Sequence, residues 1–89
     1  MANFEWNREK EKINVIKHGI PFRFAIKAFS DVDRIIERDK SHSIKEERFF
    51  CYGLVDGDVM TVRFTMRGNN IRIFGAAYWR KGRKIYEKK

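Results

Sequence analysis

The sequence has one cysteine, no apolar run long enough to span a membrane and no secretory signal at its start. The lone Cys51 cannot form an internal disulfide, and its apolar neighbours predict a small buried residue. A membrane helix needs about 18 consecutive apolar residues, and the polar start MANFEWNREKEK does not resemble a signal peptide. These absences favour a protein of the reducing cytoplasm with no membrane partner.

Motifs for metal and nucleotide binding are also missing. The sequence contains no CxxC, no HExxH and no glycine-rich phosphate loop, so we expect neither a metal nor another cofactor. No internal repeat or low-complexity tract occurs. A chain of 89 residues with 43% hydrophobic residues and eight phenylalanines can build one core, which excludes a wholly disordered chain and predicts a single domain over residues 1–89.

Acidic residues are nearly absent from the C-terminal third. Residues 1–58 hold eleven Lys or Arg and eleven Asp or Glu, a net charge of zero, whereas residues 59–89 hold nine Lys or Arg and one Glu, a net charge of +8. A concentrated positive field attracts polyanions. This asymmetry favours nucleic acid or an acidic protein as the partner, although a surface that serves only solubility would also be basic.

Two helices are predicted in the first 30 residues. The first follows Asn7, a good N-cap, and ends at Gly19, a residue that tolerates the left-handed conformation. Its apolar stripe would consist of Ile13, Ile16 and Val15. The second helix follows Pro21, and its buried face is predicted from the i, i+3, i+4, i+7 spacing. That face consists of Phe22, Ala25, Ile26 and Phe29.

Strand patterns fill most of the remaining chain. RIIERD is typical of a short strand, and RFFCYGLV, VMTVRFTM and IRIFGAAYW follow it, with a tight turn predicted at Asp56-Gly57. KGRKIYEKK predicts a short C-terminal helix. The fold class is therefore α+β, with two N-terminal helices packed on an antiparallel sheet of three or four strands and a short helix at the end.

Several segments together resemble one known family. FEWN, KHGIPFRFAIKAFSD, HSIKEERF, Gly53, VRFTMRGNNIRI and the pair Tyr86-Glu87 are similar to BrnT-type toxins of bacterial type II toxin–antitoxin pairs. The resemblance implies a RelE-like fold, RNA cleavage that arrests growth, and a small antitoxin with a ribbon-helix-helix DNA-binding domain. It also implies that DNA is contacted only through the toxin–antitoxin complex. The chain departs from the family where Ala77 replaces a strand arginine.

The chemistry of a metal-free ribonuclease defines the candidate residues. Such an enzyme uses the RNA 2′-hydroxyl as nucleophile, moves protons with a group such as histidine, and stabilises the phosphorane with arginine or lysine. An aromatic ring can stack an unpaired base. The expected catalytic residues are Lys17, His18, Arg67 and Arg72. The expected substrate-binding residues are Arg63, Trp79, Arg80, Lys81, Arg83 and Lys84.

Plainer roles stay open for the same residues. His18, at a helix C-terminus, would interact favourably with the helix dipole without any catalysis, and His42 fits an exposed loop histidine. Any one arginine could pair with a carboxylate, and Arg48 fits a salt bridge with the preceding glutamates. The whole chain could thus be a non-catalytic basic module that binds an acidic partner or nucleic acid. The nuclease hypothesis requires the cations of the last third to converge on one concavity.

Overall fold

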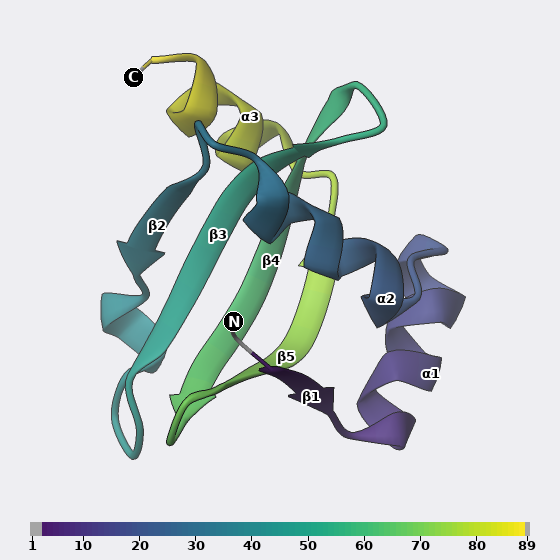
Figure 1. Ribbon diagram of the computed structural model, residues 1–89, viewed down its shortest axis with the longest axis vertical. Coiled ribbons are helices and arrows are strands. Elements are labelled where there is room, and N and C mark those ends of the chain that lie inside the picture. The colour runs from purple at the N-terminus through teal and green to yellow at the C-terminus, as the bar shows by residue number, and fades with distance from the viewer. Residues whose placement is uncertain (1–2, 89) are drawn as a thin grey trace.

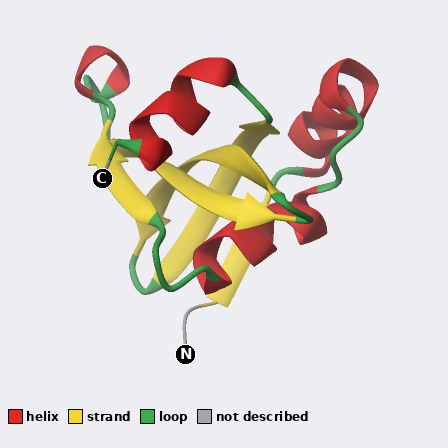
Figure 2. Ribbon diagram, turned by 90° about the horizontal axis from the view of Figure 1, so that it is seen from above, coloured by secondary structure: helices red, strands yellow, loops and turns green. Residues whose placement is uncertain are grey.

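The computed structural model describes residues 3–88 and consists of a five-stranded mixed sheet with helices on both sides (Figures 1 and 2). The strand order is β1-β5-β4-β3-β2. β1 is parallel to β5, and the other neighbouring pairs are antiparallel. The strands are β1 (Asn3–Trp6), β2 (Ile35–Arg38), β3 (Arg48–Val55), β4 (Asp58–Arg67) and β5 (Asn70–Ala77).

The α+β class is confirmed, but the prediction of three or four antiparallel strands is wrong. The sheet has a fifth strand, β1, and its pairing with β5 is parallel. β1 has only four residues and pairs from Asn3 opposite Asn70 to Trp6 opposite Ile73. A pattern so short shows no clear alternation, and its partner lies near the other end of the chain, so local sequence could not reveal the pairing.

The first helix, α1 (Arg8–His18), has the predicted ends. The side-chain oxygen of Asn7 accepts hydrogen bonds from the backbone N–H groups of Glu9 and Lys10 at 2.9 and 3.1 Å. Gly19 follows the helix with a φ of 70°, the left-handed conformation that glycine adopts without steric cost. α1 lies beside β5 at the edge of the sheet, whereas α2 crosses the face (Figure 1).

The predicted apolar stripe of α1 is wrong. Ile13 is 51% exposed and Ile16 is 78% exposed, while Asn14 between them is only 6% exposed. The helix therefore packs through a polar side chain. Hydrophobic spacing could not show this, because the partner of Asn14 is the backbone of β5 and not an apolar side chain.

The main core lies between the sheet and the second helix. α2 (Phe22–Ala25) continues as the 3₁₀ helix η1 (Ile26–Ser30), and Phe22 and Ala25 are fully buried as predicted. We call this side of the sheet the α2 face. Cys51 is buried in this core, and its burial raises the pKa of the thiol to about 12.

The other side of the sheet carries α3 (Arg80–Glu87), and we call it the α3 face. A small cluster of Tyr52, Val59 and Tyr86 is buried beneath this helix. The β3–β4 turn has φ values of 52° at Asp56 and 84° at Gly57, which confirms the predicted tight turn. In the region from residue 3 to residue 88, no helix is long and apolar enough to cross a membrane.

Candidate functional site

The register of β4 against β5 decides which arginines share a face. The register shifts by one residue at a β-bulge: Phe64 pairs with Ile73, but Arg63 pairs with Gly75, so Phe74 is the extra residue on β5. Two residues further along β4, Thr65 pairs with Arg72. Arg63 and Thr65 point to the same side of their strand, and Arg72 therefore shares the α3 face with Arg63. Simple alternation in the sequence could not decide this, because the bulge adds one residue to β5.

Asn14 fixes α1 against this part of the sheet. β1 pairs with β5 only as far as Ile73, so the next residues of β5 have a free edge. There Asn14 donates to the carbonyl of Ala76 at 3.0 Å and accepts from the Ala76 N–H at 3.1 Å. It also donates to the carbonyl of Ile20 at 2.9 Å. The amide thus takes the place of a neighbouring strand and brings the last turn of α1 to the α3 face.

A cavity of about 370 Å³ lies where α1 meets the α3 face. It is lined from β4 by Arg63, from β5 and the residues after it by Phe74 and Trp79, and from α1 by Lys10, Ile13, Asn14, Lys17 and His18. The rings of His18 and Trp79 meet edge to face with centroids 6.2 Å apart. Four of the residues predicted from the sequence, two catalytic and two substrate-binding, therefore lie together.

Arg63 is the most unusual cation of this cavity. Its guanidinium lies over the rings of Phe74 and Trp79, with Cζ 5.4 and 5.9 Å from the centroids. Its Nε is buried without a hydrogen-bond partner, and no carboxylate of residues 3–88 forms an ion pair with it. Burial, and then the nearby Arg48 charge, lower the pKa of Arg63. The charge of Asp39 opposes this shift without forming an ion pair. An arginine remains protonated nonetheless, so a half-buried positive charge without an ion-pair partner faces the cavity.

Arg48 is a functional candidate that the sequence interpretation assigned to salt bridging. It does contact Glu46, but only at 3.6 Å. Its Cζ lies 4.6 Å from the centre of the Phe74 ring, which Arg63 also contacts, and its Nε is likewise buried without a partner. Two like charges on one ring repel each other, and an anion bound between them would relieve that repulsion. Arg48 and Phe50 lie two residues apart on β3 and therefore point to the same face of the sheet, which was the signal in the sequence that Arg48 could lie near the site.

Arg67 and Arg72, the two arginines predicted to be catalytic, lie away from this cavity. Arg72 donates to Glu5 with Nη1 2.6 Å from Oε2, and Asn70 donates to the same carboxylate at 2.9 Å. The hydrogen bonds from Asn70 and then Arg72 lower the pKa of Glu5. Arg67 is exposed at the end of β4. Neither arginine lines the cavity, so their catalytic role stays a prediction.

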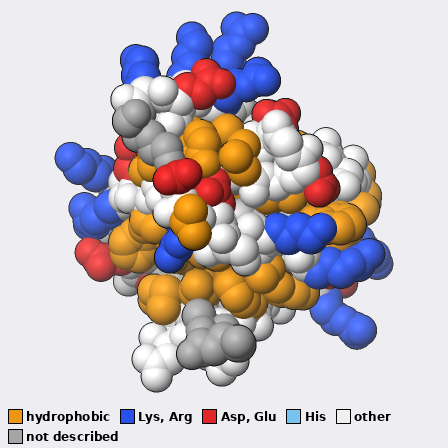
Figure 3. Space-filling model, turned by 45° about the horizontal axis from the view of Figure 1, so that its top comes forward, with side chains coloured by type: hydrophobic (Ala, Val, Ile, Leu, Met, Phe, Trp, Pro, Cys, Tyr) orange, Lys and Arg blue, Asp and Glu red, His pale blue; other side chains and the backbone are white. Residues whose placement is uncertain are grey.

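The cations of the C-terminal helix are only partly gathered. Arg83 lies 3.8 Å from both Asp58 and Glu87. Lys81 lines a separate small cavity beside Trp79, whereas Arg80 and Lys84 are exposed and line neither this cavity nor the one with His18. Figure 3 shows one face of the molecule, on which Lys and Arg side chains project around the rim with acidic groups among them. Among the described cations of residues 59–88, Arg63 alone lines the His18 cavity, so the expected convergence of the basic third on one concavity is wrong, and the other cations of that cavity, Lys10 and Lys17, come from α1.

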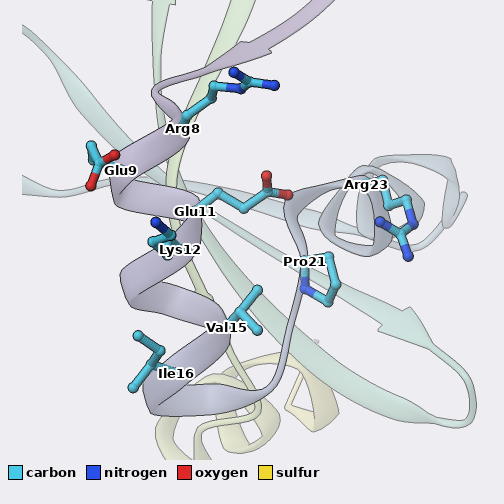
Figure 4. A pocket seen from close by; sticks show the side chains of 8 residues that line it. All are labelled: Arg8, Glu9, Glu11, Lys12, Val15, Ile16, Pro21 and Arg23. Carbon is cyan, nitrogen blue, oxygen red and sulfur yellow. The ribbon is translucent and has the colours of Figure 1, made fainter.

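The largest cavity of the described residues belongs to the opposite side of α1. It measures about 500 Å³ and lies between α1 and α2 (Figure 4). Glu11 lies in it and accepts a hydrogen bond from the N–H of Phe22 at 2.8 Å. Arg8, Lys12 and Arg23 also line it, so its charge is mixed. It contains none of the residues that the sequence marks as catalytic.

His42 has a structural role in the loop after β2. Its Nδ1 lies 2.9 Å from Oδ2 of the buried Asp39, and the imidazole side chain is 65% exposed. Within residues 3–88, no three His, Cys, Asp or Glu side chains gather as the ligands of a metal ion would. The two histidines therefore occupy different environments, since His18 shares a cavity with Arg63 and His42 shares one with Arg48.

Comparison with protein families now adds an independent finding. A model of the family described as "Ribonuclease toxin, BrnT, of type II toxin-antitoxin system" matches residues 6–82. The chain belongs to the BrnT family. The match spans β2 to β5, both N-terminal helices and the start of α3, and thus includes every residue of the His18 cavity. A search of curated proteins found no match.

Membership of the BrnT family defines the general activity and the general partners. The family consists of ribonuclease toxins, so RNA is the substrate class, and a type II system pairs its toxin with a protein antitoxin. The resemblance noted in the sequence is confirmed.

Proposed function

We propose that this BrnT-family chain is a metal-independent endoribonuclease that cleaves single-stranded RNA in the His18 cavity. The observation that carries the proposal is the position of His18 beside Arg63, a half-buried guanidinium without a carboxylate partner. A histidine can move protons near neutral pH, and an unpaired arginine can hold a phosphate. Together they can supply proton transfer and phosphate binding, the two functions that RNA cleavage needs when no metal ion takes part.

The proposed reaction is an internal transesterification. His18 removes the proton of the 2′-hydroxyl, whose oxygen attacks the adjacent phosphorus, while Lys17 protonates the departing 5′-oxygen. The O2′–P bond forms as the P–O5′ bond breaks, which leaves a 2′,3′-cyclic phosphate and a 5′-hydroxyl. His18 and Lys17 are consecutive at the end of α1 and line the same cavity, so both can reach one phosphodiester.

Arg63 supplies the charge that stabilises the transition state. The phosphorane carries more negative charge than the substrate, and preorganised cations in a water-poor site stabilise such charge strongly. Arg48 lies over the same Phe74 ring, with Cζ 4.6 Å from its centroid against 5.4 Å for Arg63, but lines the neighbouring cavity with His42, so it adds only to the local positive field.

We further propose that the neutralising partner is a small antitoxin with a ribbon-helix-helix DNA-binding domain, and that the fold is RelE-like. The net charge of +8 on residues 59–89 suits an acidic antitoxin segment. The toxin would then reach DNA only through the antitoxin, as part of a complex that represses its own operon. Expression without the antitoxin should arrest growth.

The test measures cleavage of single-stranded RNA by the purified protein in EDTA. His18→Ala and Arg63→Ala should each lower kcat by about 100-fold or more, in the range of one proton-transfer or charge-stabilising group. Arg23→Ala is the matched control, because Arg23 is exposed and lies outside the cavity. Fragments with 5′-hydroxyl ends identify the reaction. Equal activity of His18→Ala and Arg23→Ala would refute the site.

A non-catalytic binding module remains the second candidate, because two observations favour it. Ala77 lacks the family arginine, and Arg72 is already held by Glu5 at 2.6 Å. A module of this kind would bind RNA with an affinity that falls steeply with salt and would cleave none of it. The same EDTA assay therefore separates the two candidates.

A further inference from the structure

A second cavity lies on the other side of Trp79 from the His18 cavity. It measures about 200 Å³ and is lined by Phe50, Tyr52, Thr61, Trp79, Lys81 and Gly82. Since Trp79 belongs to both cavities, they are neighbours across one indole ring. Nothing in the proposed cleavage chemistry uses the second cavity.

The walls of this cavity are aromatic. The rings of Phe50 and Tyr52 stack with centroids 5.9 Å apart and planes inclined by 21°. Trp79 is 39% exposed, although an indole gains from burial, and Lys81 places a positive charge at the rim. Aromatic rings beside a cation are what proteins use to stack the unpaired bases of single-stranded RNA.

The floor of the cavity contains a polar group without a partner. Thr61 is 1% exposed, and its Oγ1 is buried without a hydrogen bond among residues 3–88. Gly82 packs over this hydroxyl, so the floor of the cavity is closed and a ligand would contact the aromatic side walls. Gly82 keeps α3 close above the hydroxyl, since a Cβ at that position would collide with Oγ1.

The size of the cavity limits its occupant. Sites for drug-sized ligands measure about 300–1,000 Å³, so about 200 Å³ suits one flat ring system and not a whole nucleotide. Its neighbourhood limits the occupant further, because Arg63 and Trp79 border the cavity in which the phosphate would bind. A base attached to a nucleotide next to that phosphate can reach across Trp79.

We propose that this cavity holds one unpaired RNA base next to the cleaved phosphodiester and thereby selects the cleavage position. The base stacks on the accessible aromatic surface of Phe50 and Trp79, with the positive charge of Lys81 at the rim. This subsite rests on the proposed function, because it uses the His18 cavity as the place of cleavage.

The test uses a short single-stranded RNA with one mapped cleavage site and a series in which one base at a time is removed. Loss of the stacked base should lower kcat/KM of the wild-type protein about 5- to 150-fold at one position next to the cut. In Phe50→Leu that penalty should largely disappear, because the intact RNA also loses its stacking partner.

Phe49→Leu is the matched control. Phe49 is the preceding residue on β3, is similarly half-buried, and packs on the α2 face against Phe64. It should keep the full penalty. If Phe50→Leu does not fold, the abasic series on the wild-type protein still tests the proposal, because it needs no substitution in the protein.

Two results would overturn the proposal. One is a wild-type enzyme that cleaves with no penalty at any abasic position. The other is a penalty that is equal in wild type, Phe50→Leu and Phe49→Leu, as expected if the cavity instead receives an antitoxin side chain. If the wild type cleaves no RNA, the proposed function fails, and fluorescence anisotropy with the same oligonucleotides tests the subsite alone. An abasic penalty on binding that Phe50→Leu removes would then support the subsite.

Discussion

Replacing Asn14 by alanine should destabilise the protein more than truncating any of the apolar neighbours of Asn14 on α1. The substitution removes three hydrogen bonds, at 2.9, 3.0 and 3.1 Å, to the backbones of Ile20 and Ala76. Each such bond contributes about 0.5–1.5 kcal/mol net, and buried groups left unpaired cost more. Alanine recovers up to about 0.7 kcal/mol in helix propensity.

The expected loss in the free energy of unfolding is therefore about 2–4 kcal/mol. A domain of 89 residues has a total stability of roughly 4–13 kcal/mol, so this is a large share. With an m value of about 1–3 kcal/mol/M, the urea midpoint should fall by about 1–3 M. The assay is urea unfolding followed by circular dichroism, with m checked for constancy.

Ile16→Ala is the control on the same helix. Ile16 is 78% exposed, so its truncation should change the stability by about 0.5 kcal/mol or less. If Ile16→Ala costs as much as Asn14→Ala, then α1 packs through its apolar stripe and the position of His18 described above is wrong. The stability measurement thus tests the geometry of the site without any assay of RNA cleavage.

Two further predictions concern single contacts on the α3 face. Gly75→Ala should lower RNA cleavage to the level of Arg63→Ala, because a Cβ would collide with the flexible guanidinium of Arg63 and displace it. The urea midpoint should stay nearly unchanged. Unchanged cleavage would contradict this prediction. Glu5→Gln should lower stability at pH 7, because Glu5, with its pKa below 4.5, loses its charged hydrogen bonds to Asn70 and Arg72. A carboxyl whose pKa is lower in the folded state stabilises the fold at pH values above its unfolded-state pKa. The difference in stability between Glu5→Gln and the wild type should therefore shrink as the pH falls below 4.5. A difference that is constant with pH would rule out this linkage.

Local signals in the sequence predicted most of the elements. Asn7 and Gly19 marked the ends of α1, and Asp56-Gly57 marked the β3–β4 turn, because caps and tight turns depend on residues close together in the chain. β1 was missed because four residues carry little pattern and its partner lies near the other end of the sequence.

The candidate site was predictable as a set of residue types but not as an arrangement. Lys17, His18, Arg63 and Trp79 were named from the sequence, and the structure places them around one cavity. Arg72 was also named, yet its contact with Glu5 depends on the pairing of β1 with β5. The sequence predicted only a salt bridge for Arg48. Its contact with Phe74 reaches from β3 across β4 to β5 and depends on the strand register, which neighbouring residues in the sequence do not show.

The sequence by itself determined the basic C-terminal third, the caps and turns, and the resemblance to BrnT toxins, since each of these depends on residue identity and short spacing. Only the tertiary structure decided which cations meet. A buried amide on α1 replaces a missing strand, and one bulge sets the phase of β5. Both act between segments far apart in the chain, where the position of a charge depends on backbone pairing and not on its neighbours in sequence.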